Sequence, residues 1–405
     1  MSEKEFDVLI VGAGPAGAAC AMTLGQTGLS VAILDKAVFP RDKTCGDALS
    51  IDVINQLSIL SPVLAASFAE FAQKTSVNSI RVFSPDRSYI DISIDIDGKY
   101  GQICKRLDFD NLLVQHVKQF PTIHLFENCS VQSIDQQSDR IILETSEGIF
   151  KGQILVGADG AYSVVSRHLG TIKTERKHYS AGLRVYYEGV SFLNTGHFIE
   201  LHFLRELLPG YLWIFPLPDN KANVGLGMLS SIVSKKKINL RETLQRFLST
   251  DASLKERFKN ARPLENVKGH GLPLGSKQRV ISGARILLTG DAASLIDPLT
   301  GEGIGNAIRS GRIAGDHIKN CFSRRDFSAA FNTAYDREIY RRMGGELRLS
   351  TRLQQLCKHP KLMNFVVKKA NRNAAVQRLL VEGLTQTDKK VSLISPGFYY
   401  RLLFK

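Results

Sequence analysis

The chain has 405 residues, a mass of 44.9 kDa and a formal net charge of +14. Its 43% hydrophobic and 23% charged residues are typical of a globular protein, which excludes disordered and collagen-like classes. The six cysteines form no C-x-x-C pair, so we expect neither a metal site nor a secreted disulfide framework, and a reducing cytosol fits.

The positive charge is concentrated at the C-terminal end. Residues 341–405 contain fourteen Lys and Arg residues against three acidic residues, a net charge of +11 that leaves +3 for residues 1–340. This distribution disfavours nucleic acid as a partner. Three interpretations of the basic segment stay open: a solvated surface, contact with an anionic membrane face, or docking of an acidic carrier or electron-donor protein.

The N-terminal pattern predicts a β-α-β unit. A short apolar run at 6–11 indicates a buried parallel strand, and the glycine-rich residues 12–17 follow it. A small-residue stretch at 18–24 is helical in composition, and a second strand at 30–34 ends at Asp35. Residues 8–34 carry no charge, but the glycines and the proline within them favour this interpretation over a membrane span.

Each glycine of this unit has a place in the dinucleotide fingerprint. Gly12 allows a tight turn, Gly14 allows close approach to a pyrophosphate, and Gly17 allows helix–strand packing. Asp35, which Lys36 follows, lies where an acid binds ribose hydroxyls. Because the acid favours a free 2′-hydroxyl, the sequence predicts FAD or NAD rather than NADP.

The rest of the chain alternates between the two element types. The patterns predict helices over 51–71, 107–118, from 303 onward and over 327–356, and strands within 79–96, 124–142, 154–157 and 285–289, with a separate sheet over 184–227. The chain opens on acidic residues rather than a basic, apolar leader, so we expect no secretory signal and a cytoplasmic location, with the inner face of a membrane as an alternative.

Two further strand ends carry acids and glycines. The strand at 154–157 leads into Asp159 and Gly160, and the strand at 285–289 leads into Gly290 and Asp291. Such ends place carboxylates against sugar hydroxyls at the carboxyl edge of a sheet. The loop at 297–303 then opens a helix, whose free N–H groups point at whatever lies in front of it. If that is the pyrimidine end of a flavin, they would stabilise negative charge on the reduced ring.

Taken in order, these three motifs resemble those of the flavoprotein superfamily that includes aromatic hydroxylases, flavin halogenases and geranylgeranyl reductases. The resemblance implies that Asp291 contacts the ribityl chain, that Asp159 serves both cofactor and second-substrate sides, and that Arg106 lies near the pyrophosphate. With the fingerprint, it implies FAD contacts at Gly12, Gly14, Pro15, Ala16, Gly17, Asp35, Lys36, Cys45, Gly46, Arg106, Asp159, Gly160, Gly290, Asp291, Pro298, Gly301, Gly303 and Ile304.

Two segments point to one subfamily. Residues 43–50 (KTCGDALS) resemble the cysteine–glycine loop of geranylgeranyl reductases, although the pair at 47–48 departs from the glycine or glutamate that is usual there. Residues 209–216 (PGYLWIFP) resemble the motif that lines the lipid cavity of that family, and 224–227 continue it. Tyr211, Trp213 and Phe215 alternate on a strand and share one face. They form either the aromatic wall of an apolar substrate site or part of an ordinary core.

The expected fold is α/β, with a Rossmann-like FAD-binding domain interleaved with a mainly antiparallel substrate domain and followed by C-terminal helices. The expected boundaries are 1–75, 100–170 and 270–325 for the FAD-binding domain, 76–99 and 171–269 for the substrate-binding domain, and 326–405 for the C-terminal segment.

The resemblance implies an FAD-dependent reductase that adds hydride and a proton to a carbon–carbon double bond of an isoprenoid or other apolar lipid. Cys45, Tyr211 and an ordered water are the candidate proton donors, and NAD(P)H or a reduced redox protein is the expected electron donor. Two alternatives stay open: a flavin monooxygenase or halogenase acting on an aromatic or polyene substrate, and a non-catalytic prenyl-binding escort.

Overall fold

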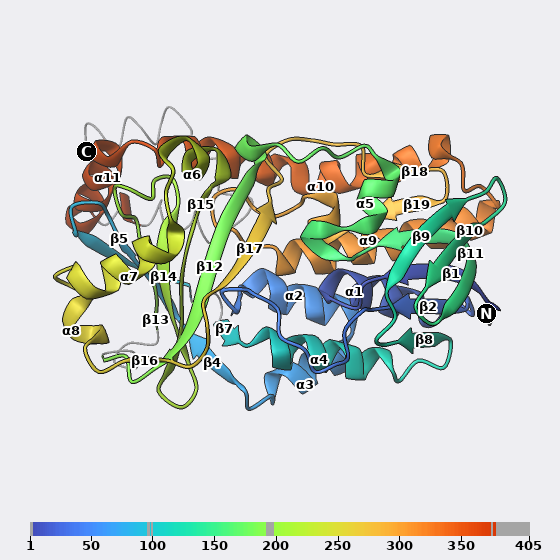
Figure 1. Cartoon of the computed structure of the whole chain (residues 1–405), viewed down its shortest axis with the longest axis horizontal. Helices are drawn as coiled ribbons and strands as arrows, with labels where there is room; N and C mark the ends of the chain where they lie inside the picture. Colours follow the sequence, from blue (N-terminus) through green and yellow to red (C-terminus); the bar gives the residue numbers. More distant parts are fainter. Residues whose placement is uncertain (1–2, 95–97, 99, 192–197, 374–375, 378–405) are drawn as a thin grey trace.

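The computed structural model describes residues 3–94, 98, 100–191, 198–373 and 376–377. Of the basic segment at 341–405, residues 374–375 and 378–405 lie outside the described residues. The described chain forms two large sheets, which occupy opposite halves of an elongated molecule (Figure 1).

The first sheet is the predicted nucleotide-binding sheet. Its strands run in the order β18-β19-β11-β1-β2-β8, with β10 on β11 and β9 on β10. β1 pairs in parallel with β2 and β11, and β2 pairs in parallel with β8, as the buried apolar runs predict. The strands are β1 (Glu3–Val11), β2 (Val31–Leu34), β8 (Ile123–Phe126), β9 (Val131–Gln136), β10 (Ile141–Thr145), β11 (Gly148–Gly157), β18 (Ser282–Gly283) and β19 (Ile286–Leu288).

Helices cover this sheet and hold its loops. Two of these helices, α1 (Pro15–Leu24) and α9 (Ile304–Arg324), pack closely against each other, since a Cβ at Gly311 of α9 would lie 2.1 Å from the carbonyl oxygen of Ala16. The approach brings the first and third cofactor motifs together. The other helices of this half are α2 (Ile51–Leu60), α3 (Pro62–Ala69), α4 (Arg106–Val117), α5 (Val164–Leu169) and α10 (Ala329–Leu356), with short 3-10 turns η1 (Gly160–Tyr162) and η3 (Gly290–Ala293). Near the second sheet lie α6 (Ser230–Lys236), α7 (Leu240–Thr250), α8 (Lys255–Phe258), α11 (Pro360–Arg372) and the 3-10 turn η2 (Arg176–His178).

The second sheet is mainly antiparallel. Its order is β16-β12-β15-β14-β13-β5-β6, with β17 on β12, and its parallel pair is β13 with β5. The strands are β5 (Ser79–Phe83), β6 (Tyr89–Ser93), β12 (Tyr179–Glu188), β13 (Phe198–His202), β14 (Tyr211–Leu217), β15 (Lys221–Leu229), β16 (Arg262–Pro263) and β17 (Lys268–Pro273).

A third, small sheet connects the two halves. It consists of β3 (Ala48–Leu49), β7 (Gly101–Cys104) and β4 (Lys74–Val77). Leu49 and Cys104 belong to the core of the first half, whereas Val77 and Ile103 pack with the second sheet. The small sheet therefore ties the two cores together.

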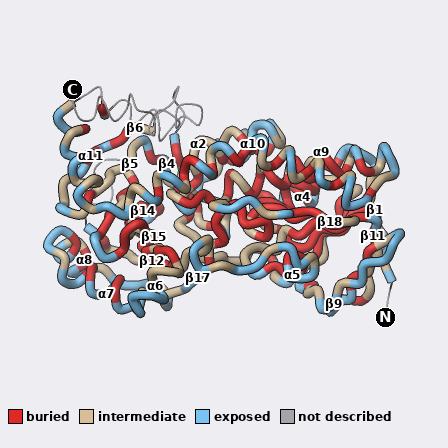
Figure 2. The backbone as a smooth tube through the Cα atoms, turned by 90° about the horizontal axis from the view of Figure 1, so that it is seen from above, coloured by how far each residue is buried: buried red, intermediate tan, exposed pale blue. Residues whose placement is uncertain are grey.

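Burial follows this division, with buried backbone concentrated along the strands of both sheets (Figure 2). The expected architecture, an FAD-type α/β sheet with a mainly antiparallel sheet and C-terminal helices, is confirmed. Among the described helices, none has the length and apolarity needed to span a bilayer.

Candidate functional site

A cavity of about 850 Å³ lies where the two sheets meet. It is lined by the carboxyl ends of β1 and β2, by the loops after β11 and β19, and by one face of the second sheet. The structure therefore brings all three predicted cofactor motifs and the predicted aromatic strand to one cavity.

The three glycines of the fingerprint have different surroundings. Gly12 has φ +101°, and a Cβ there would lie 2.4 Å from the carbonyl oxygen of Ala158. A Cβ at Gly17 would lie 1.9 Å from the carbonyl oxygen of Gly12, so both positions are closed by the protein itself. At Gly14, however, the nearest atom is Nη2 of Arg41, 3.7 Å away. The fold itself would therefore tolerate a side chain at Gly14, and the space that its absence leaves is open to a ligand.

Asp35 accepts hydrogen bonds from backbone amides of the glycine turn and of its own loop. Its Oδ2 accepts a hydrogen bond from the amide of Ala13 at 2.8 Å, and its Oδ1 accepts one from the amide of Ala37 at 2.9 Å. Each carboxylate oxygen has a second lone pair. Asp35 and Lys36 both line the cavity, so Asp35 is placed to hold the turn and to accept from ribose hydroxyls.

The second motif contains a buried atom without a partner. Oδ2 of Asp159 accepts from the amide of Val164 at 2.7 Å, whereas Oδ1 is buried and forms no hydrogen bond. Burial raises the pKa of this carboxyl. Because an unpaired buried acceptor is costly, Oδ1 fits a position that a bound hydroxyl or amide would satisfy.

The third motif lines the same cavity as Asp159. Asp291 forms an ion pair with Lys43, with 3.5 Å between Oδ2 and Nζ. Gly303 precedes the first residue of α9, and no side chain caps the N-terminus of this helix. The open space at Gly14, the unpaired Asp159 oxygen and this uncapped helix end fit a flavin nucleotide.

Two of the eighteen predicted cofactor residues lie outside the cavity lining. They are Gly17 and Gly290, and both pack against neighbouring backbone or alanine side chains. Their part in the site is to permit close packing. The other sixteen line the cavity: Gly12, Gly14, Pro15, Ala16, Asp35, Lys36, Cys45, Gly46, Arg106, Asp159, Gly160, Asp291, Pro298, Gly301, Gly303 and Ile304.

The aromatic strand β14 forms one wall of the cavity. The ring centroids of Tyr211 and Trp213 lie 6.2 Å apart, as do those of Trp213 and Phe215. The same cavity is lined by Val77, Ile80, Ile94, Ile103, Ile199 and Leu201. All three rings therefore border an apolar chamber, although Phe215 is also part of a core cluster.

The Tyr211 hydroxyl donates a hydrogen bond to the carbonyl oxygen of Thr300, in the loop before α9. Burial raises the pKa of Tyr211 well above its ordinary value, and nearby acids raise it further. The phenol therefore stays protonated, and it ties the aromatic wall to the third cofactor motif.

The cysteine loop lies between the cofactor motifs and the aromatic wall. A Cβ at Gly46 would meet Cε2 of Phe215 at 3.0 Å. Burial lowers the pKa of Arg106, but Asp110 and the neighbouring Cys45 thiol outweigh it and raise the pKa above its ordinary value. Cys45 is thus placed beside a cation at the junction of the two halves of the cavity.

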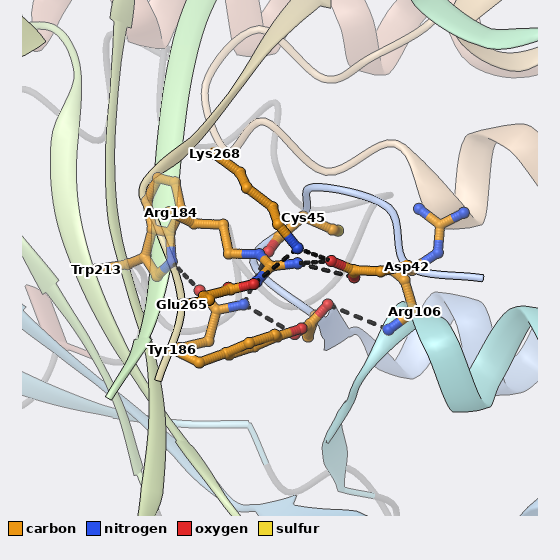
Figure 3. Close-up of polar contacts among 10 residues, drawn as sticks. Asp42, Cys45, Arg106, Arg184, Tyr186, Trp213, Glu265 and Lys268 are labelled. Atoms are coloured by element: carbon orange, nitrogen blue, oxygen red, sulfur yellow. Dashed lines mark hydrogen bonds and ion pairs between the residues drawn. The ribbon is translucent and has the colours of Figure 1, made fainter. Parts of the chain in front are cut away.

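A buried polar network behind this loop was not predicted from the sequence (Figure 3). Its centre is Asp47, which accepts from the Tyr186 hydroxyl at 2.6 Å and from Nδ2 of Asn223 at 2.8 Å. Arg184 lies over the Tyr186 ring and binds Asp42 at the other end of the loop. Alternation along β12 could have placed Arg184 and Tyr186 on one face, but no local pattern pairs them with residues 42 and 47.

Comparison with known proteins gives two family matches. The model described as an FAD binding domain matches residues 5–217, and the model described as a geranylgeranyl reductase catalytic domain matches residues 187–270. Together they span residues 5–270, which contain the first two cofactor motifs and the aromatic strand, whereas the third motif follows them.

Curated relatives extend over most of the chain. A digeranylgeranylglycerophospholipid reductase of Methanocella arvoryzae is 29% identical over 371 residues, covering 87% of this chain and 88% of the relative. A menaquinone reductase of Mycobacterium tuberculosis is 30% identical over 326 residues, covering 78% and 76%.

Solved structures share the fold. A geranylgeranyl bacteriochlorophyll reductase-like protein from Thermoplasma acidophilum superposes with a TM-score of 0.83 at 21% identity, covering 97% of this chain and 99% of that protein. A halogenase in complex with FAD superposes with a TM-score of 0.75 at 18% identity, covering 98% and 90%.

Proposed function

The chain belongs to the geranylgeranyl reductase family of FAD-dependent oxidoreductases, and we propose that it reduces carbon–carbon double bonds of an isoprenoid or similar apolar lipid. The observation that carries the proposal is the continuity of the cavity. A single cavity of about 850 Å³ contains both the three cofactor motifs and the apolar chamber that the aromatic wall borders. A reducing cofactor and a prenyl chain would therefore share one water-poor space.

Reduced FAD bound at these motifs would supply a hydride from N5 to one alkene carbon. The protein contributes position and electrostatics. Residues of the fingerprint and Arg106 would hold the phosphates, and the N-terminus of α9 would stabilise negative charge at the ring. Tyr211, Trp213 and Phe215 would orient the flat prenyl chain and exclude water.

We propose Cys45 as the first candidate for the proton that the second alkene carbon receives. Cys45 lines the cavity beside Arg106. Tyr211 is the weaker candidate because its hydroxyl proton is already donated to the carbonyl oxygen of Thr300. An ordered water is the third candidate. Replacing Cys45 with serine and, separately, Tyr211 with phenylalanine would rank the two side chains by the loss of kcat at unchanged FAD content.

The electrons for FAD would come from NAD(P)H or from a small reduced redox protein. The sequence contains one dinucleotide fingerprint, so a nicotinamide donor would bind transiently. Stopped-flow reduction of the holoenzyme by each donor, followed at the flavin absorbance, would identify the donor class.

The test of the proposed reaction is anaerobic. Holoenzyme reduced with dithionite is mixed with a geranylgeranyl lipid or a menaquinone, and the flavin absorbance and the product mass are followed. The proposal expects substrate-dependent flavin reoxidation and a product heavier by two hydrogen atoms per turnover. No reoxidation by either lipid class would contradict it.

The same experiment in air addresses the alternatives. Oxygen incorporation into the product would instead support a monooxygenase, and halide incorporation would support a halogenase. A purified protein without bound flavin would support a prenyl-binding escort, although the retained cofactor motifs favour an enzyme.

We also propose that the basic segment at 341–405 attracts an anionic membrane face that holds the lipid substrate, or an acidic partner protein. Removal of residues 390–405 should weaken co-sedimentation with anionic vesicles. Unchanged sedimentation would discard the membrane contact.

We further propose that the interleaved boundaries predicted from the sequence separate an FAD-binding from a substrate-binding domain, which limited proteolysis of the holoenzyme would test.

A further inference from the structure

We infer that Asp47 is a positioning residue that holds the Cys45 loop and Trp213 in fixed relation, a role that rests on the proposed function of this site. Asp47 does not line the cavity. It lies behind Cys45 and Gly46, where its carboxylate joins the element that carries the cofactor arginine to the sheet that carries the aromatic wall.

The backbone of Asp47 is unusual. Its φ is +66°, in the left-handed region that non-glycine residues seldom occupy, and its side chain is fully buried. Its carbonyl oxygen accepts a hydrogen bond from the amide of Cys104 at 3.0 Å. A buried acid in a strained conformation persists only where surrounding contacts hold it, and such residues cluster at functional sites.

Three donors from three elements meet the Asp47 carboxylate. Oδ2 accepts from the Tyr186 hydroxyl on β12 at 2.6 Å and from Nδ2 of Asn223 on β15 at 2.8 Å. Oδ1 accepts from the backbone amide of Arg106, the first residue of α4, at 3.3 Å. The carboxylate therefore fixes α4 relative to two strands of the second sheet.

Asn223 connects Asp47 to the aromatic wall and to the cysteine loop. Its Oδ1 accepts a hydrogen bond from Nε1 of Trp213 at 2.9 Å. Its Nδ2 also donates to the carbonyl oxygen of Cys45 at 2.8 Å. One amide thus connects Asp47, the cysteine loop and the tryptophan of the aromatic wall.

The other end of the loop is held by a second set of contacts. Nη2 of Arg184 lies 2.8 Å from both carboxylate oxygens of Asp42, and Arg184 also pairs with Glu265. The guanidinium of Arg184 lies 3.8 Å from the centre of the Tyr186 ring. Residues 42–47 are therefore anchored at both ends, and Tyr186 contacts both Arg184 and Asp47. Figure 3 shows Arg184 and Tyr186 beside this loop.

The chemistry at position 47 requires a carboxylate. Because all three partners donate, an acceptor-only group satisfies them, whereas an asparagine would direct an N–H toward one of the donors. Asp47→Asn changes the charge and one acceptor with little change in volume. It should release the Cys45 loop and alter the environment of Trp213.

The chain offers two reporters that need no turnover. Trp213 is the single tryptophan, so protein emission excited at the indole band reports its environment. Cys45 and Cys357 are the two cysteines that are not buried, so a Cys357→Ser background makes Cys45 the accessible thiol. Both reporters can be read in the FAD-loaded protein.

In that background, Asp47→Asn and Asn223→Ala are each expected to shift the Trp213 emission. Each should also change the rate of Cys45 alkylation by iodoacetamide by about fivefold or more, because this is the effect of losing one buried hydrogen bond. Matched controls are Asp336→Asn and Asn332→Ala, which alter a half-buried and a buried polar side chain of α10. The controls should leave both signals unchanged.

If Asp47→Asn fails to fold, Tyr186→Phe removes one donor to the carboxylate and gives a smaller change in the same direction. Emission and alkylation that match the controls in the folded variants would overturn the inference. A lack of lipid reduction by the parent protein would contradict the proposed function but would leave both signals, and hence the positioning role, measurable.

Discussion

Asp110 accepts two hydrogen bonds from the guanidinium of Arg106, each 2.6 Å long, from a position one turn further along α4. Nη1 of Arg41 lies 2.7 Å from the same carboxylate. Burial raises the pKa of Asp110, but the two arginines outweigh it and hold the pKa below its ordinary value. A buried carboxylate outside the cavity lining therefore orients two cations that line it.

Asp110→Asn should release both arginines. We expect FAD affinity to fall by roughly tenfold and the free energy of unfolding to fall by about 3 kcal/mol, because the buried arginine loses its counter-charge. Titration of flavin fluorescence and urea unfolding would measure the two effects. Asp108→Asn, in the first turn of the same helix, serves as the control. Equal FAD affinity in the two variants would contradict the orienting role of Asp110.

Gly14→Ala separates cofactor binding from folding. The added methyl group would have its nearest neighbour at 3.7 Å, so the fold should retain its melting temperature. FAD affinity should fall by about tenfold or more, since the methyl group would enter the space left for the pyrophosphate. Gly12→Ala should instead reduce soluble folded protein, because its Cβ would overlap the carbonyl of Ala158. Normal FAD binding by Gly14→Ala would place the pyrophosphate elsewhere.

Two glycines of β15 lie beneath Trp213 and form a matched pair. A Cβ at Gly225 would lie 2.3 Å from Cζ2 of Trp213, whereas a Cβ at Gly227 would lie 3.8 Å from Cζ3. Gly225→Ala should displace the indole, shift its emission and destabilise the protein by about 1–3 kcal/mol. Gly227→Ala should change neither the emission nor the stability. Similar behaviour of the two variants would show that β14 and β15 do not hold Trp213 as described.

The stability of the protein should depend on pH through Asp47. Burial raises the pKa of this carboxyl to about 6, although Tyr186, Asn223, Arg184 and the Arg106 amide oppose the shift. An acid with a raised folded-state pKa contributes stability below its unfolded pKa, near 3.9, and loses it as the pH rises through 6.

The free energy of unfolding of the parent, relative to Asp47→Asn, should therefore fall by up to about 3 kcal/mol between pH 4 and pH 7. Urea unfolding of the FAD-saturated proteins across this range would measure it. A difference between the two proteins that is constant with pH would show that Asp47 stays ionised throughout.

The sequence by itself determined the fold class and the cofactor. Short-range patterns carry this information: an apolar strand, the glycine fingerprint and Asp35 lie within one continuous segment, so periodicity and spacing identify them. The architecture, the FAD cofactor and the family are confirmed, whereas the substrate, the electron donor and the roles of the individual site residues remain predictions.

Only the tertiary structure decided which polar residues support the site. Asp47, Tyr186 and Asn223 are far apart in the chain, and each one alone has the pattern of an ordinary loop or strand residue. Hydrogen bonds are short-ranged and directional, so their partners depend on how α4 and the second sheet pack. The hydrogen-bond donors that satisfy the buried carboxylate at position 47 therefore surround it only after the two halves of the molecule have packed together.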